Sequence, residues 1–204
     1  MIHADPRSAL LDLLAQRSAR RGQFTLASGK QSTLYIDARL TTMSPDGLTL
    51  IGPLALAALG GSGWDVQSVG GLTLGADPIS YAISYASALA AAGAGGQGGG
   101  HARSAPTPLR AFTVRKEAKA HGTGKLVEGT FNPGDRVAVI EDVITTGGSA
   151  LKAIAALRAA GGTVAGVLAL VDREEGGRER IEEEAGVPVI SLTRASEIVE
   201  RMGG

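Results

Sequence analysis

The sequence predicts an α/β protein in which a largely parallel sheet is flanked by helices. Short apolar runs typical of strands alternate with segments of helical periodicity between about residues 66 and 192. Glycine-rich turns follow several of these runs. The chain has 204 residues, of which 44% are hydrophobic, and this is enough for one domain with a sizeable core.

The first 45 residues do not follow this alternation and predict a small appendage. Asp5 and Pro6 predict the capped start of an amphipathic helix, with Gly22 as its candidate end. Residues 24–36 predict a hairpin, because turn-forming residues separate two apolar runs. An apolar helix is expected over residues 46–60.

The rest of the chain predicts strands joined by helices. A glycine turn at Gly70-Gly71 is expected to lead into a helix that ends near Ala92. A second helix is expected over Ser149–Ala160, and a charged one before residue 187. The expected strands are Val66–Val69, Leu109–Val114, Arg136–Ile140, Val164–Val171 and Val187–Leu192.

Two segments interrupt the pattern. Residues Gly93–Pro108 consist almost wholly of small residues and predict a flexible low-complexity loop, an insertion without a function of its own. Residues Arg115–Pro133 are longer than a usual connection and carry five basic residues, so they predict either a lid over an anion or a solvated loop. Those basic residues are Arg115, Lys116, Lys119, His121 and Lys125.

Composition excludes several classes of function. Lys plus Arg equals Asp plus Glu, 20 against 20, which argues against a protein that coats nucleic acid or an anionic membrane. The chain has no cysteine, so disulfides, thiolate metal sites and a cysteine nucleophile are excluded. We recognise no signal peptide and no membrane span, and we expect a cytoplasmic protein.

The most informative segment is Val137–Ala150. An apolar run delivers two adjacent carboxylates, Glu141 and Asp142, and a Thr/Gly turn follows before the next helix. In parallel sheets, ligands bind at the carboxyl ends of the strands. Hydroxyl groups and unobstructed N–H groups at a helix N-terminus suit a phosphate, although the turn is neither a Walker A loop nor a dinucleotide fingerprint. The residues of this turn are Thr145, Thr146, Gly147, Gly148 and Ser149.

Two acids directly before a phosphate cradle are explained if the ligand presents hydroxyl groups to them. A ribose 5-phosphate meets this condition, with its phosphate in the turn and its 2′- and 3′-hydroxyls on Glu141 and Asp142. The alternative is an acidic strand end that only caps a helix.

At this point the segment resembles the signature of the type I phosphoribosyltransferases, which is an apolar run, two acids and a Thr/Gly-rich loop. Further segments resemble the orotate branch of that family, in order over roughly residues 22–175. These are Phe24–Lys30 with Tyr35–Asp37, Gly70–Ile79, Val114–Gly122 and Val171–Arg173. The pattern Arg-Lys-x-x-Lys-x-His-Gly within Val114–Gly122 favours the lid interpretation of the basic loop over the solvated one.

The resemblance implies the type I phosphoribosyltransferase fold in one domain over residues 1–204. Within it, residues 1–45 would form an N-terminal hood on the orotate side, residues 93–108 the low-complexity loop and residues 115–133 a mobile catalytic loop. The implied reaction joins orotate to the ribose of phosphoribosyl pyrophosphate, giving orotidine 5′-monophosphate and pyrophosphate in UMP biosynthesis. Mg²⁺ would be carried by the pyrophosphate and not by a direct protein site.

The resemblance also implies residue roles. The catalytic and pyrophosphate-binding residues would come from the mobile loop, which would reach into the neighbouring subunit of a homodimer; they are Arg115, Lys116, Lys119 and His121. The ribose 5-phosphate would be held by Glu141, Asp142, Val143, Ile144, Thr145, Thr146, Gly147, Gly148 and Ser149. Orotate would be contacted by Thr145, Arg173, Lys30 and Tyr35.

The chain departs from some members of the family at two positions. Ala27 and Leu74 stand where some relatives carry lysines, so cationic contacts to orotate and pyrophosphate are lost there, and Lys30 is a candidate replacement for the first. Two alternatives are a phosphoribosyltransferase for a purine or uracil, and a non-catalytic regulator that senses phosphoribosyl pyrophosphate. The Arg-Lys-x-x-Lys-x-His loop argues against the first, and the lack of room for a DNA-binding module in the first 20 residues argues against the second.

Overall fold

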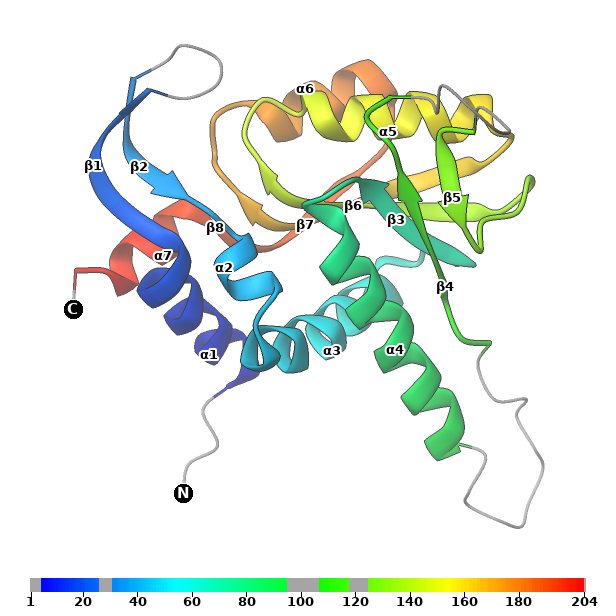
Figure 1. Cartoon of the computed structure of the whole chain (residues 1–204), viewed down its shortest axis with the longest axis horizontal. Coiled ribbons are helices and arrows are strands. Elements are labelled where there is room, and N and C mark those ends of the chain that lie inside the picture. Colours follow the sequence, from blue (N-terminus) through cyan, green and yellow to red (C-terminus); the bar gives the residue numbers. More distant parts are fainter. Residues whose placement is uncertain (1–4, 26–30, 95–106, 118–124, 204) are drawn as a thin grey trace.

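A six-stranded sheet forms the centre of the protein (Figure 1). The computed structural model describes residues 5–25, 31–94, 107–117 and 125–203. The strand order is β5-β4-β3-β6-β7-β8, with β5 antiparallel to β4 and the other neighbours parallel. The predicted α/β class is therefore confirmed. The strands are β3 (Ser68–Leu72), β4 (Arg110–Val114), β5 (Val127–Gly129), β6 (Arg136–Ile144), β7 (Thr163–Asp172) and β8 (Val189–Arg194).

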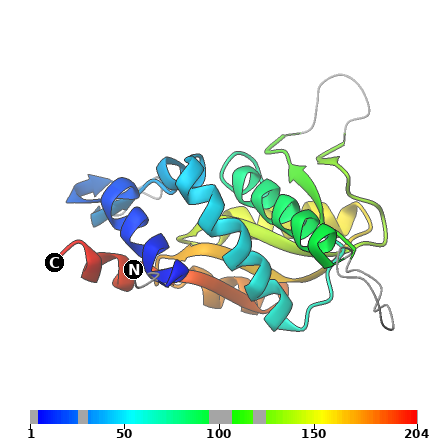
Figure 2. The ribbon, with the colours of Figure 1, turned by 90° about the horizontal axis from the view of Figure 1, so that it is seen from below.

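Helices cover both faces of this sheet (Figures 1 and 2). One face carries α3 (Pro45–Ser62) and α4 (Ala76–Ala94), and the other carries α5 (Gly148–Ala159) and α6 (Gly177–Ala185). Side chains of β6 alternate between the two cores, because successive residues of a strand point to opposite faces. Ala138 and Ile140 pack with the α3 and α4 side, whereas Val137 and Val139 pack with α5 and α6.

The N-terminal segment adds a helix and a two-stranded hairpin that share a core with the central sheet. Asp5 caps α1 (Pro6–Leu13) by accepting a hydrogen bond from the Ser8 N–H at 3.2 Å, as the sequence predicts. One π-helical turn (Leu14–Ser18) follows, and then β1 (Ala19–Thr25) pairs antiparallel with β2 (Gln31–Ile36). The hairpin is confirmed. The expected helix end at Gly22 is wrong, because the backbone is already extended at Ala19 and Gly22 lies within β1.

Other differences from the sequence-based expectation have clear causes. Gly70 and Gly71 do not form a turn; they belong to β3, which pairs on both sides with β4 and β6. A side chain at Gly71 would collide with the Ile140 carbonyl of β6, so the close approach of neighbouring strands accounts for the glycine. Elements that the sequence did not reveal are α2 (Arg39–Thr42), β5 and α7 (Ala195–Arg201).

A buried carboxylate joins the amino ends of three sheet strands. Asp135 accepts hydrogen bonds from Arg110 Nη2 at 2.6 Å, Ser68 Oγ at 3.1 Å and the Asn132 N–H at 2.9 Å. Burial acts to raise the pKa of Asp135, but the hydrogen bonds from Asn132, Arg110 and Ser68 outweigh it and lower that pKa below its ordinary value. The charged form of Asp135 therefore stabilises the sheet. None of the helices in the described ranges is long and apolar enough to cross a membrane.

Candidate active site

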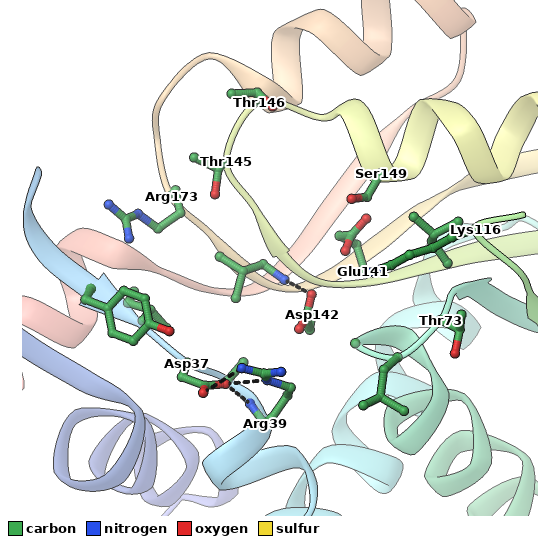
Figure 3. Close-up of a pocket in the computed structure, with 17 residues that line it drawn as sticks. Asp37, Arg39, Thr73, Lys116, Glu141, Asp142, Thr145, Thr146, Ser149 and Arg173 are labelled. Atoms are coloured by element: carbon green, nitrogen blue, oxygen red, sulfur yellow. Dashed lines mark hydrogen bonds and ion pairs between the residues drawn. The ribbon is translucent and has the colours of Figure 1, made fainter. Parts of the chain in front are cut away.

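A cavity of about 430 Å³ opens at the carboxyl ends of the central strands (Figure 3). Its walls come from the end of β2, the connection after β3, the residues after β4, and the ends of β6 and β7. This is the edge at which ligands bind in parallel α/β sheets. The lining residues are Tyr35, Ile36, Asp37, Ala38, Arg39, Leu72, Thr73, Leu74, Gly75, Lys116, Glu141, Asp142, Val143, Thr145, Thr146, Ser149 and Arg173.

The two predicted acids lie on the wall of the cavity at the end of β6. Glu141 is 6% exposed, and both its burial and the neighbouring Asp142 raise its pKa well above the ordinary value. Asp142 is less buried, and its Oδ1 accepts a hydrogen bond from the Val143 N–H at 2.8 Å. The pair therefore offers carboxyl oxygens that can accept hydrogen bonds from hydroxyl groups of a ligand.

Gly75 makes room for one of these acids. A Cβ built at Gly75 would lie 2.5 Å from Asp142 Cγ and 2.6 Å from Oδ1, and still closer to Oδ2. The connection after β3 can approach the acid pair only because residue 75 has no side chain. Thr73 in the same connection donates a hydrogen bond from Oγ1 to Asp77 at 2.7 Å, which ties the connection to the first turn of α4.

The turn between β6 and α5 forms the side of the cavity that suits an anion. Thr145, Thr146 and Ser149 line the cavity, and α5 begins at Gly148. Gly147 has φ +76°, and a Cβ there would lie 2.7 Å from the Gly177 carbonyl, so glycine is required for this tight turn. Hydroxyl groups and the N-terminus of α5 together provide hydrogen-bond donors and a favourable helix dipole.

Arg173 and Tyr35 also line the cavity. The Arg173 side chain is 6% exposed, and its Nη2 donates to Glu175 Oε1 at 2.7 Å and to Ser32 Oγ at 3.2 Å. Its buried Nε has no hydrogen-bond partner within the described part of the chain. The ring of Tyr35 packs on Phe24 with centroids 5.4 Å apart. A buried guanidinium on the wall of a cavity is suited to a planar anion.

The structure brings many of the sequence-predicted residues together but not all of them. Arg115 is not part of the cavity wall; its Nη1 pairs with Glu128 at 3.2 Å and its Nε donates to the Glu117 carbonyl at 3.4 Å. Ile144 belongs to the core, and Gly147 and Gly148 are not among the residues that line the cavity. Lys30, Lys119 and His121, as well as Ala27, lie outside the described residues.

The segments Tyr35–Asp37 and Gly70–Ile79, which carried part of the resemblance, both reach the cavity wall, but sequence reasoning did not single out Asp37 or Arg39 as site residues. Asp37 and Arg39 line the cavity, with Arg39 Nε and Nη2 donating to the Asp37 carboxylate at 2.8 and 2.9 Å. Through the hydrogen bond from Arg39, the pKa of Asp37 falls below its ordinary value. The one local signal was the Asp-x-Arg pattern directly after a predicted strand, and nothing local shows that it faces the acids of β6.

Comparisons with known proteins give relatives that match almost the whole chain. No protein-family model matches the chain. An orotate phosphoribosyltransferase of Aquifex aeolicus is 44% identical over 196 residues, covering 95% of this chain and 97% of the relative. One from Sorangium cellulosum is 42% identical over 191 residues, covering 93% and 91%.

Solved structures give the same result. The orotate phosphoribosyltransferase of Mycobacterium tuberculosis in complex with 5-phospho-alpha-D-ribosyl 1-diphosphate has a TM-score of 0.72 and 36% identity, covering 96% of this chain and 99% of that one. The Aeropyrum pernix enzyme has a TM-score of 0.71 and 30% identity, with coverage of 96% and 99%.

The parallel sheet, the acid pair and the Thr/Gly turn thus define the class of type I phosphoribosyltransferases. Within that class, the chain is more than 40% identical to the two orotate phosphoribosyltransferases above over almost its whole length, and this identifies the family. The chain belongs to the orotate phosphoribosyltransferase family.

Proposed function

We propose that this protein transfers ribose 5-phosphate from phosphoribosyl pyrophosphate to orotate, forming orotidine 5′-monophosphate and pyrophosphate. The observation that carries the proposal is one cavity that joins a carboxylate pair, a hydroxyl-rich helix N-terminus and a buried arginine. These groups match the hydroxyls, the phosphate and the carboxylate that the two substrates present. Family membership supports the same activity.

Each wall of the cavity then has a substrate group to bind. Thr145, Thr146 and Ser149 would hold the 5-phosphate, and Glu141 and Asp142 the ribose hydroxyls. Arg173 would bind the orotate carboxylate, because its fork of N–H groups can meet two oxygens at once. Tyr35, on β2, would flank the base. The β1–β2 hairpin would thus serve as the predicted hood of the orotate site.

The reaction needs cations where negative charge grows. Orotate attacks the anomeric carbon of the ribose as the bond to pyrophosphate breaks, so charge develops on the leaving group. Lys116 already lines the cavity, and we propose that Lys119 and His121 join it when the predicted loop closes. In the same closure Arg115 would exchange Glu128 for pyrophosphate. Closure would also exclude the water that competes with orotate for the activated sugar.

We propose that Mg²⁺ enters the site on the pyrophosphate. The ion would be carried by oxygens of the pyrophosphate and by water, without a direct protein site, because Mg²⁺ keeps several of its waters when it binds substrate phosphates. Glu141 and Asp142, which line the cavity, would stay free to accept the ribose hydroxyls. Once bound, the ion would neutralise part of the charge on the leaving group. Phosphoribosyl pyrophosphate affinity should consequently fall when the metal is chelated.

We also propose that the protein is a homodimer that shares its catalytic loops. An exposed apolar surface runs over α2, α3 and α4, and patches of this kind mark protein interfaces. Its exposed side chains include Leu40, Met43, Leu48, Leu74, Tyr81, Tyr85 and Leu89. Leu74 also lines the active-site cavity, so a partner on this surface would lie next to that cavity. The predicted cytoplasmic location stays a prediction.

Base selectivity tests the main proposal. Protein, Mg²⁺ and phosphoribosyl pyrophosphate are mixed with orotate, uracil, hypoxanthine or adenine, and pyrophosphate release is measured. We expect release with orotate alone, since only orotate offers a carboxylate to Arg173. Turnover of a purine as fast as orotate would refute the base assignment. Binding of phosphoribosyl pyrophosphate without turnover of any base would instead indicate the regulator.

Mixing of two inactive variants tests the shared loop. Lys119→Ala should lose a cation of the loop, and Asp142→Asn a ribose contact, so each variant alone should be nearly inactive. In a mixed dimer, one site combines an intact acid pair with an intact loop from its partner. Random exchange makes about half of the dimers mixed, with one good site of two, so recovery should approach roughly one quarter of wild-type activity.

Lys125→Ala is the matched control, because it removes a basic residue of the same predicted loop. Lys125 lies beside β5 and does not line the active-site cavity. The activity of Lys125→Ala alone should be close to that of the wild-type protein. Exchange is verified by mass spectrometry of tagged chains. If subunits exchange and activity stays at the level of the single variants, each loop serves its own subunit.

A further inference from the structure

Arg39 is a cation on the cavity wall that sequence reasoning did not find. It is the first residue of α2, shortly after the end of β2, and it lines the cavity together with Asp142 and Lys116. In the view of Figure 3, Asp142 lies between Arg39 and the turn that carries Thr145 and Thr146. Arg39 therefore faces the acid pair from the side opposite the phosphate-binding turn.

Asp37 holds the Arg39 side chain in place. The Asp37 carboxylate accepts hydrogen bonds from Arg39 Nε at 2.8 Å, Nη2 at 2.9 Å and the Arg39 N–H at 3.2 Å. The backbone of Asp37 is itself anchored, because its N–H donates to the Ser18 carbonyl at 2.9 Å. One edge of the guanidinium is thus occupied, whereas Nη1 makes no hydrogen bond to any of the described residues.

The distribution of positive charge suggests what Arg39 binds. Among the described residues, the basic side chains that line the cavity are Arg39, Lys116 and Arg173. Arg173 is paired with Glu175 and lies near Thr145, where the base is proposed to bind. Arg39 and Lys116 remain for the pyrophosphate, which is the most highly charged group of the substrates.

A neighbouring position on the cavity wall carries no charge. Leu74 lines the same cavity, but its side chain is apolar and 53% exposed, so it contributes no charge to a bound anion. Asp142 is close enough to Arg39 to interact with it electrostatically. A cation at this place can bind the group attached to C1 of a ribose whose hydroxyls are held by Asp142.

We propose that Arg39 binds the pyrophosphate group of phosphoribosyl pyrophosphate, with Asp37 as the residue that positions its guanidinium. Arg39 thereby supplies, from the neighbouring wall, the positive charge that Leu74 lacks. The inference rests on the proposed function and adds a binding residue to it.

Direct binding measurements test the proposal without turnover. Titration calorimetry with Mg²⁺ is used to measure affinity for phosphoribosyl pyrophosphate, for pyrophosphate and for orotidine 5′-monophosphate. Arg39→Ala should weaken the first two about 10- to 100-fold, as expected for loss of a charge-assisted contact. Affinity for orotidine 5′-monophosphate should stay within about threefold of wild type, because that ligand has no pyrophosphate. Arg39→Lys should recover a large part of the loss.

Arg17→Ala is the matched control. Arg17 pairs with Asp46 at 2.7 Å and its side chain is 41% exposed, against 49% for Arg39, but it lies outside the cavity. All three affinities should be unchanged in this variant. Asp37→Asn should weaken phosphoribosyl pyrophosphate binding by a smaller factor, and should add nothing in an Arg39→Ala background, since Asp37 acts through Arg39.

The outcomes separate this inference from the proposed function. If the wild-type protein forms no orotidine 5′-monophosphate, the proposed function fails. If the wild type is active and Arg39→Ala binds pyrophosphate normally, only the role of Arg39 is wrong. Equal losses for all three ligands, or a change of oligomeric state in analytical ultracentrifugation, would show that Arg39 supports the fold or the interface and would overturn the proposal.

Discussion

Replacement of Gly75 by alanine should separate the geometry of the active site from the stability of the fold. The added Cβ would lie 2.5 Å from Asp142 Cγ and 2.6 Å from Oδ1, whereas ordinary van der Waals contacts begin near 3.4 Å. Either the carboxylate or the connection after β3 must therefore move by roughly 1 Å, and displacements of this size can reduce turnover by about 100-fold. Asp142 is only partly buried, so it can move without unfolding the protein.

The measurement is pyrophosphate release at saturating orotate, combined with thermal unfolding. We expect Gly75→Ala to lose about 100-fold in kcat/KM for phosphoribosyl pyrophosphate, with a Tm within a few degrees of wild type. Gly61→Ala is the control, because a Cβ at Gly61 on α3 meets nothing within 4 Å. Activity of Gly75→Ala within threefold of wild type would refute the idea that the substrate requires Asp142 at its observed position.

Three further predictions concern stability. Burial raises the pKa of Glu141, so the contribution of its protonated form to stability is present below the unfolded-state pKa and is lost as pH rises through the folded-state pKa. Glu141→Gln should remove this loss and stabilise the protein by about 0.5–2 kcal/mol near pH 7, as measured by urea titration. The same variant should weaken phosphoribosyl pyrophosphate binding. Asp135 has a lowered pKa, so its stabilising effect is present above the unfolded-state pKa of about 3.9 and is lost as pH falls through the folded-state pKa. Asp135→Asn should lower the free energy of unfolding by roughly 1–3 kcal/mol at pH 7 and should flatten its decline at acid pH. An unchanged dependence of the unfolding free energy on pH would contradict this. Replacing residues 95–106, inside the predicted low-complexity loop, with a short Gly/Ser linker should leave Tm and turnover unchanged in parallel assays, whereas unfolding would show that the segment is packed.

Local signals in the sequence were sufficient for much of the architecture. The Asp5 cap, the hairpin and the order of strands and helices follow from residue types that act over a few positions. The acid pair and the Thr/Gly turn after β6 could be found for the same reason, because strand, turn and helix are adjacent in the chain. Element ends were less predictable, and Gly22 and the Gly70-Gly71 pair show why. A glycine permits a turn but also permits close packing inside a strand, and only the neighbouring chain decides which occurs.

The remaining part of the candidate site depended on tertiary structure. Asp37 and Arg39 follow β2 at the start of α2, whereas Asp142 lies in β6 about 100 positions later in the chain, and no local pattern reveals that they line one cavity. The partner of Arg115 is likewise Glu128 across the β4–β5 pair and not the cavity. Sequence determined which chemical groups the protein has and in which local frame each is held. Packing of α1 and the end of the hairpin into the same core as the central sheet determined which of those groups meet, because burial of apolar surface brings distant segments together irrespective of the polar side chains that they carry.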